Sequence, residues 1–226
     1  MLYAVGDIHG EARKLDALLG RLPLERGDRF VFLGDYIDRG PDSRAVIERL
    51  LSLRREHECV FLLGNHESML LDFLGFADPA YFGGDAFLMN GGDRTLDSYH
   101  YFDRETPDLA GFRLPKEHED FLLGLRLFHR EADYVFVHAG IDPRELGSRD
   151  ADYALRRSRI EDLLWNRTVG DSAHGLGVTI VYGHTPGENL GVRWNPPFSI
   201  GIDTGAVFGG PLTAIRLPDE QVFQVA

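Results

Sequence analysis

The chain has 226 residues, 43% of them hydrophobic and 27% charged, which is typical of a soluble globular protein with one large domain. Its formal net charge is −12, so it has no excess of basic residues to follow a phosphate backbone. This disfavours a nuclease or any other protein that acts on long nucleic acids.

The first residues and the cysteine content indicate the compartment. Met1 leads directly into the apolar segment 2–5, and no apolar stretch approaches the roughly 20 residues of a membrane helix. The single cysteine, Cys59, lies in an apolar run, which indicates a buried thiol rather than a catalytic thiolate. We therefore expect a cytoplasmic protein with no membrane partner.

Strand-like and helix-like segments alternate in the first third of the chain. The apolar patterns predict strands at residues 2–5, 30–33 and 59–63, and helices at residues 11–22 and 43–55. A βαβαβ order predicts a parallel sheet with right-handed crossovers.

The pattern weakens from about residue 69 to residue 127, where aromatic residues and glycines are frequent. We interpret this segment as a helical cap inserted into a single domain of residues 1–226 and facing the substrate; the alternative is a solvated connector. Beyond it we predict a helical stretch at 150–165 and strands at 134–137, 179–182, 198–202, 212–217 and 221–225. Short turns between the last strands predict antiparallel pairing, so the sheets are expected to be mixed.

Six of the predicted strands end in a polar residue, usually just after a glycine. Ligands of α/β sheets bind beyond the carboxyl ends of strands, so these side chains can converge although they are distant in sequence. The six residues are Asp7, Asp35, Asn65, His138, His184 and Asp203.

These residue types suit a metal site. Asp7 and His9 are two residues apart and can point the same way from an extended backbone. The two oxygens of Asp35 can bridge two cations at the ~3.5–4 Å spacing of two-metal hydrolytic sites, although a helix-capping aspartate is the simpler alternative for this residue alone. Carboxylate, imidazole and amide ligands without a thiolate suit Mn²⁺, Fe or Zn²⁺. The remaining histidines lack this context and are interpreted as structural: His57, His100, His118, His129 and His174.

Three segments resemble the signature motifs of the phosphoprotein phosphatase family, the calcineurin-like metallophosphoesterases. They are Gly6-Asp7-Ile8-His9-Gly10, Gly34-Asp35-Tyr36-Ile37-Asp38-Arg39-Gly40 and Gly64-Asn65-His66-Glu67. His138-Ala139-Gly140 and Gly183-His184-Thr185 continue the resemblance, which covers nearly the whole chain. The ending, residues 202–210, is similar to that of the small bacterial and phage-lambda-type branch.

The resemblance implies an αββα sandwich of two mixed sheets flanked by helices, with two divalent metal ions. By position, the first metal would be held by Asp7, His9 and Asp35, and the second by Asp35, Asn65, His138 and His184. We expect Mn²⁺, with Fe, Zn²⁺ or Ni²⁺ as alternatives. Hydrolysis would proceed by direct attack of a hydroxide held between the metals, without a phosphoenzyme.

The resemblance also implies roles for residues beside the metals. His66 is expected to protonate the leaving oxygen, oriented by Asp38, and Arg39 with Asn65 to bind the phosphate. Arg167 resembles the family's second phosphate-binding arginine, with Arg156, Arg157, Arg159 and Arg193 as competitors. Asp203 is not a family ligand and is expected to orient His184 or to cap the turn at Thr204-Gly205.

The function expected is that of a protein serine/threonine phosphatase, with phosphotyrosine as a further substrate. The alternative is a hydrolase of diadenosine tetraphosphate and other dinucleoside polyphosphates. Glu67, rather than an aspartate at this position, resembles the protein phosphatases more and slightly favours that activity. A non-catalytic metal scaffold would lack a ligand or the acid, and none is missing. The sequence leaves the substrate, the native metal, regulation and the oligomeric state open.

Overall fold

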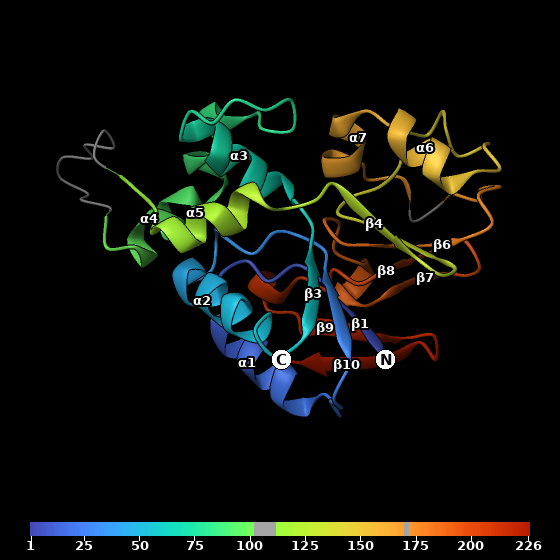
Figure 1. The fold of residues 1–226 in the computed structure, drawn as a ribbon, viewed down its shortest axis with the longest axis horizontal. Coiled ribbons are helices and arrows are strands. Elements are labelled where there is room, and N and C mark those ends of the chain that lie inside the picture. The colour runs from blue at the N-terminus through green and yellow to red at the C-terminus, as the bar shows by residue number, and fades with distance from the viewer. Residues whose placement is uncertain (102–111, 170–171) are drawn as a thin grey trace.

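The structure is a computed structural model that describes residues 1–101, 112–169 and 172–226. Its strands form two five-stranded mixed sheets that pack face to face, with helices on both outer faces (Figure 1). The αββα sandwich that the resemblance implies is thereby confirmed.

The first sheet has the strand order β10-β9-β1-β2-β3. Its three parallel strands are the ones that the sequence predicts in the first third of the chain, joined by α1 and α2, and two antiparallel strands from the end of the chain complete the sheet. The elements are β1 (Leu2–Val5), α1 (Ala12–Arg21), β2 (Arg29–Phe32), α2 (Ser43–Leu53), β3 (Glu58–Phe61), β9 (Leu212–Leu217) and β10 (Gln221–Val225).

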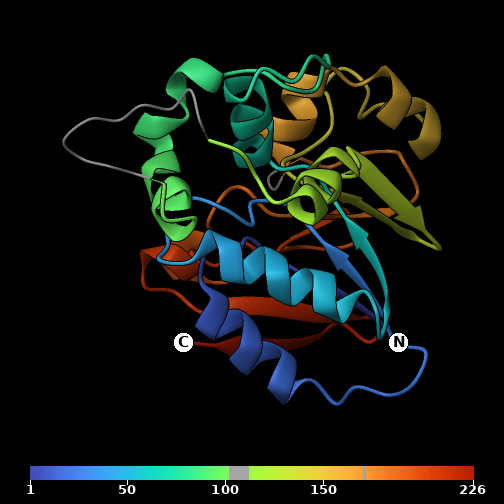
Figure 2. The ribbon, with the colours of Figure 1, turned by 60° about the vertical axis from the view of Figure 1, so that its left-hand side comes forward.

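The second sheet has the order β4-β5-β6-β8-β7, with β5, β6 and β8 parallel and an antiparallel strand at each edge. Helices α6 and α7 cover its outer face, as Figure 2 shows from a second direction. The elements are β4 (Phe128–Glu131), β5 (Tyr134–Val137), α6 (Ala151–Arg157), α7 (Ile160–Trp165), β6 (Thr179–Tyr182), β7 (Arg193–Asn195) and β8 (Ser199–Gly201).

Alternation along the strands separates the apolar layers. In β1, Tyr3 and Val5 pack toward the helices, while Leu2 and Ala4 pack between the sheets against residues such as Phe136. Since successive strand side chains point to opposite faces, a strand buried on both faces is apolar throughout. This is why β1, β2, β5 and β6 could be predicted from continuous apolar runs.

The segment 69–127 contains the end of α3 (Asn65–Phe73), η1 (Gly84–Ala86), η2 (Leu88–Asn90), α4 (Gly92–Ser98) and α5 (Lys116–Leu123). Its helical character agrees with the prediction, and Phe87, Leu96 and Phe121 join it to the core of the first sheet. Part of it, 102–111, lies outside the described residues, and its role as a cap facing the substrate stays a prediction. No helix in the described ranges is both long enough and apolar enough to cross a membrane.

The prediction of one helical stretch at 150–165 is wrong in one respect, because two separate helices occupy these residues. Ser158 and Arg159, with ψ of 139° and 146°, are extended and separate α6 from α7. The Ser158 hydroxyl donates to the Ala154 carbonyl and accepts from the Asp142 N–H, so a side chain competes with the helix ladder. The edge strands β4 and β7 were not predicted, since they are short and largely polar.

Candidate active site

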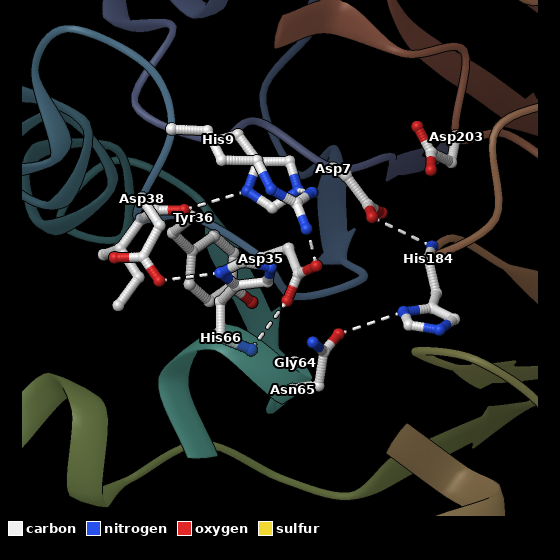
Figure 3. A network of polar contacts seen from close by, with 12 residues as sticks. Asp7, His9, Asp35, Tyr36, Asp38, Gly64, Asn65, His66, His184 and Asp203 are labelled. Atoms are coloured by element: carbon white, nitrogen blue, oxygen red, sulfur yellow. Dashed lines mark hydrogen bonds and ion pairs between the residues drawn. The ribbon is translucent and has the colours of Figure 1, made fainter. Parts of the chain in front are cut away.

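The polar residues that follow the parallel strands of both sheets converge at one place. Asp7 follows β1, Asp35 follows β2 and Asn65 begins α3 after β3, while His138 and His184 follow β5 and β6. All five are buried, and Figure 3 shows most of this group with its neighbours. The structure therefore brings together ligand candidates from both halves of the chain, as the sequence predicts.

Several of these residues adopt a backbone conformation that side chains other than glycine rarely take. His9, Asp35 and His184 have φ values of 45°, 51° and 63°. Such conformations cost roughly 1–3 kcal/mol each and occur mainly where function requires them. Here the Ile8 and His9 N–H groups both donate to the Asp35 carbonyl, which ties the first two loops together.

Glu67 organises the loop that carries Asp35. Its buried carboxylate accepts hydrogen bonds from the backbone N–H groups of Asp35 (2.9 Å), Tyr36 (2.8 Å), Ile37 (3.3 Å) and Gly64 (3.1 Å). The sequence analysis used Glu67 only to compare substrate classes and missed this structural role. A charged residue in the third position of a helix, next to ligand candidates, was the available signal.

Glycine is required where the loops approach the ligand atoms. A Cβ atom at Gly64 would lie 2.2 Å from Asp35 Oδ1, and one at Gly183 would lie 2.1 Å from Asp7 Oδ1. No side chain fits at these distances. The glycines that precede the strand-end residues are therefore part of the geometry of the site.

Hydrogen bonds to backbone carbonyls determine which imidazole nitrogen faces the site. His138 Nδ1 donates to the Leu33 carbonyl (2.9 Å) and His9 Nδ1 to the Ile37 carbonyl (2.9 Å). In the neutral ring this leaves a lone pair on Nε2, the atom that faces Asp35 at 3.5 Å in both cases. A pair of acceptor atoms oriented toward each other is the arrangement that a cation stabilises.

The ligand atoms form two clusters that share Asp35. His9, Asp35 and His66 make one group and Asp35, His138 and His184 the other, with the ligand atoms of each group within 4.8 Å of one another. The Asn65 Oδ1 atom lies 3.0 Å from His138 Nε2 and 2.9 Å from His184 Nδ1. The geometry thus fits a cation on each side of the Asp35 carboxylate.

Three buried atoms of the predicted site residues have no hydrogen-bond partner among the described residues. They are Asp7 Oδ1, His66 Nε2 and His184 Nε2. Asp7 is not a member of either cluster, and His66 stands in the first cluster where the sequence predicts Asp7; the Oδ2 atom of Asp7 accepts the His184 N–H (2.9 Å). Unpartnered buried polar atoms are costly in a native protein, and these three are positioned for a ligand or an ion.

Burial favours the neutral state of the histidine ligand candidates, which is the state that metals require, whereas it raises the pKa of Asp7 well above its usual value. It lowers the pKa of His9 to about 3 and, together with the nearby His138, the pKa of His184 to about 2, so both rings are neutral at pH 7. Burial raises the pKa of Asp35, but the imidazoles of His138 and His66 outweigh it, and the net pKa lies well below the usual value. Neutral imidazoles around an ionised carboxylate are the donor set of a divalent cation site.

His66 and Asp38 form a buried pair beside the clusters. His66 Nδ1 lies 2.7 Å from Asp38 Oδ2, and both side chains are fully buried. The backbone N–H of His66 donates to Asp35 Oδ1 at 3.1 Å, so the pair is adjacent to the shared carboxylate. The pairing that the resemblance implies for these two residues is present in the structure.

The predicted phosphate-binding arginines differ in how firmly they are held. Arg39 Nη1 donates to His9 Nε2 (2.7 Å), and its guanidinium lies over the Phe208 ring, 5.4 Å from the centroid. Arg167 is exposed, and its charge is among the causes that lower the pKa of His184, after burial and His138.

Two of the competing arginines are paired elsewhere. Arg157 lies 3.8 Å from Glu145, and Arg159 forms an ion pair with Asp162 at 2.7 Å. Arg167 is therefore better placed than these two, and the choice of Arg167 over Arg156 and Arg193 stays a prediction.

Residues to which the sequence analysis gave structural roles lie in structural contacts. Asp203 Oδ1 accepts the Gly205 N–H (2.9 Å), so it caps the turn, one of the two expected roles. His118 is buried against Tyr99 and His174 bonds to the Phe198 carbonyl. Cys59 is half-buried, and burial raises its pKa to about 12, which agrees with a structural thiol.

The sequence model of the family described as "Calcineurin-like phosphoesterase" matches residues 2–206. The chain belongs to this family. Because its homologues are hydrolases, this calcineurin-like phosphoesterase is an enzyme, and the metal clusters agree with the dinuclear divalent site of the family.

Relatives with different activities cover nearly the whole chain. It is 32% identical to "Serine/threonine-protein phosphatase 1" of Salmonella typhimurium, over 96% of this chain and 91% of that protein. It is 28% identical to an asymmetrical bis(5'-nucleosyl)-tetraphosphatase of Oceanobacillus iheyensis, over 98% of this chain and 90% of that protein. A cold-active protein-tyrosine phosphatase of a psychrophilic Shewanella species shares the fold, with a TM-score of 0.62 at 20% identity, over 100% of this chain and 80% of that one.

Proposed function

We propose that this calcineurin-like phosphoesterase is a metal-dependent phosphomonoesterase that dephosphorylates phosphoserine and phosphothreonine in proteins, with phosphotyrosine as a further substrate. The observation that carries the proposal is one carboxylate, Asp35, shared by two ligand clusters beside the His66–Asp38 pair. The similarity to a serine/threonine phosphatase over nearly the full length supports the substrate class. A phosphorylated protein or a small phosphoester would be the partner of the site.

Two divalent cations, when bound, supply an activated water near neutral pH and neutralise the charge on the phosphoryl oxygens. The neutral imidazoles, carboxylates and amide oxygen of the site suit Mn²⁺, with Fe, Zn²⁺ or Ni²⁺ as alternatives. We assign the first ion to Asp7, His9 and Asp35 and the second to Asp35, Asn65, His138 and His184.

His66 is the proposed general acid. Its Nδ1 is hydrogen-bonded to Asp38, so its Nε2, which is buried and has no partner among the described residues, is the atom that can hold a proton for the leaving oxygen. The Asp38 carboxylate stabilises the protonated ring. Because an alkoxide is a poor leaving group, this proton matters most for phosphoserine and phosphothreonine.

Arg39, Arg167 and the Asn65 amide are the proposed phosphate ligands. A guanidinium offers paired donors that match two phosphate oxygens. Arg39 is held over the Phe208 ring, and its hydrogen bond to His9 Nε2 would be given up when a cation takes that atom, whereas Arg167 is exposed and can adjust to the substrate.

A substrate panel tests this function. The protein is depleted of metal, reconstituted with Mn²⁺ and assayed on p-nitrophenyl phosphate, a phosphoserine peptide and a phosphotyrosine peptide, with His66→Asn and Asp35→Asn as controls. We expect Mn²⁺-dependent turnover of all three, with both variants reduced at least about 100-fold on the phosphoserine peptide. No turnover of any substrate, or full activity in the Asp35 variant, would overturn the proposal.

Hydrolysis of dinucleoside polyphosphates is the second candidate. The similarity to a bis(5'-nucleosyl)-tetraphosphatase supports it, as does the exposed ring of Phe208 against Arg39, since an aromatic side chain beside a phosphate ligand can stack on a nucleobase. The kcat/KM on diadenosine tetraphosphate, measured beside that on the phosphoserine peptide, distinguishes the two. A ratio above about 100 in favour of the dinucleotide would replace the first candidate with the second.

A further inference from the structure

Asp38 is held by two hydroxyl groups that the sequence analysis did not single out. Thr95 lies in α4 and Ser43 begins α2, and both side chains are fully buried against Asp38. We infer that Thr95, supported by Ser43, is a positioning residue that fixes the Asp38 carboxylate for proton donation by His66. The inference rests on the proposed function, in which His66 is the general acid.

The donors and acceptors of this group can be assigned from the distances. Thr95 Oγ1 lies 2.5 Å from Asp38 Oδ1, and since a carboxylate only accepts, the Thr95 hydroxyl donates. That uses the single hydroxyl hydrogen of Thr95, so Ser43 must be the donor in the 2.9 Å contact between the two hydroxyls. The Asp38 N–H in turn donates to Ser43 Oγ (3.0 Å) and also lies 2.9 Å from Thr95 Oγ1.

The result is a closed ring of hydrogen bonds from the Asp38 backbone through Ser43 and Thr95 to the Asp38 side chain. It stabilises a backbone with a φ of 70°, a conformation that aspartate adopts only with local support. It also occupies Oδ1, so that Oδ2 is left to accept from His66 Nδ1 at 2.7 Å. Rotation of the carboxylate would break both contacts at once, and the imidazole is thereby held in a single orientation.

The same helix is tied to the loop that binds phosphate. The Arg39 N–H donates to the Gly91 carbonyl (3.1 Å) directly before α4, and the Arg44 N–H donates to Ser98 Oγ (3.2 Å) at its end. The segment beyond residue 69 thus reaches the loop of Asp38 and Arg39 through the Gly91 carbonyl and the Thr95 hydroxyl. In this arrangement the segment contributes to the geometry of catalysis as well as covering the core.

Replacing the hydroxyl of Thr95 tests the inference. Thr95→Val keeps the shape and removes the donor, while Thr95→Ser keeps the donor. Each is assayed with Mn²⁺ on a phosphoserine peptide, whose alkoxide needs a proton, and on p-nitrophenyl phosphate, whose phenolate leaves without one. For Thr95→Val we expect kcat on the peptide to fall about tenfold, kcat on p-nitrophenyl phosphate to fall less than about threefold, and KM to stay unchanged. Thr95→Ser should retain the wild-type ratio of the two kcat values.

Thr213→Val is the matched control, because Thr213 is equally buried and its hydroxyl bonds to Thr204 and Gln224 instead. It should leave the ratio of the two kcat values unchanged. Equal losses on both substrates in Thr95→Val, or a serine variant that behaves like valine, would overturn the inference. If the valine variant does not fold, Ser43→Ala must lower the ratio of kcat on the phosphoserine peptide to kcat on p-nitrophenyl phosphate, and Thr95→Ser must leave that ratio unchanged. Any other result refutes the positioning role of Thr95. Failure of the wild type on both substrates would instead refute the proposed function.

Discussion

Gly64→Ala is the sharpest single perturbation of the proposed metal site. Gly64 has φ and ψ of −95° and 169°, which alanine adopts without strain, so the backbone itself tolerates the change. The added Cβ atom, however, would lie 2.2 Å from Asp35 Oδ1, 2.4 Å from the Asp35 backbone nitrogen and 2.8 Å from Glu67 Oε2. The first two distances are at least 1 Å below the 3.4 Å of ordinary van der Waals contact, so both the shared carboxylate and the loop backbone that carries it must move.

The consequences can be estimated from that displacement. Moving a catalytic group by 1 Å costs about 100-fold in rate, so kcat/KM on p-nitrophenyl phosphate should fall by about that factor. Overpacking a close-packed site costs about 1–3 kcal/mol, which should appear as a lower free energy of unfolding in the metal-free protein. The affinity for Mn²⁺, measured by calorimetry, should fall as well, because Asp35 is the proposed ligand of both ions.

Gly20→Ala provides the matched control. Gly20 lies in α1, and a Cβ atom there meets nothing within 4 Å. Alanine should stabilise this helix by about 0.5–1 kcal/mol and leave kcat/KM unchanged. A Gly64 variant with the kcat/KM and Mn²⁺ affinity of the wild type would refute the assignment of Asp35 as the shared ligand.

Three further predictions concern metal, pH and the loop beside Arg39. Excess chelator should abolish turnover, and turnover that survives chelation would contradict the metal dependence. Mn²⁺ added back at about 100 times its Kd should raise the free energy of unfolding by about 2.7 kcal/mol. Burial raises the pKa of Glu67 to about 8, so the folded metal-free chain holds a proton that the unfolded chain releases, and the contribution of this residue to stability should fall as the pH rises from 4.5 through 8. The lowered pKa values of His9 and His184 act in the opposite direction up to about 6.5, so the quantity to measure is the difference between the wild type and Glu67→Gln in urea unfolding at pH 6 and pH 8. The stability of the wild type relative to Glu67→Gln should be lower at pH 8 than at pH 6, and an equal or higher value would contradict the prediction. Lys14 donates to the Ala206 and Gly210 carbonyls on either side of Phe208. In steady-state assays, Lys14→Met should therefore raise KM several-fold with little change in kcat. An unchanged KM would show that this loop does not contact the substrate.

The sequence predicts the framework of the site because its information is local. Apolar runs buried on both faces identify the parallel strands, and a glycine followed by Asp, Asn or His identifies their ends. The rule that strand ends meet at one edge of a sheet then brings Asp7, Asp35 and Asn65 together without any structure. The same rule, applied to the second sheet, places His138 and His184.

The contacts that orient these ligands could not be predicted in this way. Thr95 lies 57 residues from Asp38, and nothing in the residues around it distinguishes it from any other helical threonine. The backbone contacts of Glu67 depend on the curvature of the Asp35 loop, and the break at Ser158 depends on a side-chain hydrogen bond to the preceding turn. Such features arise from tertiary packing, which periodicity and spacing do not encode.

The proposed ligands come from both sheets, with Asp7 and Asp35 on the first and His138 and His184 on the second. The second ion, with Asp35 and Asn65 beside the first sheet and His138 and His184 beside the second, would be a cross-link between the two halves of the molecule, and pulling the halves apart would require its release. Metal occupancy would then set the lifetime of the folded chain against proteases as well as its turnover. Under metal starvation, the loss of activity would be followed by the loss of the protein itself.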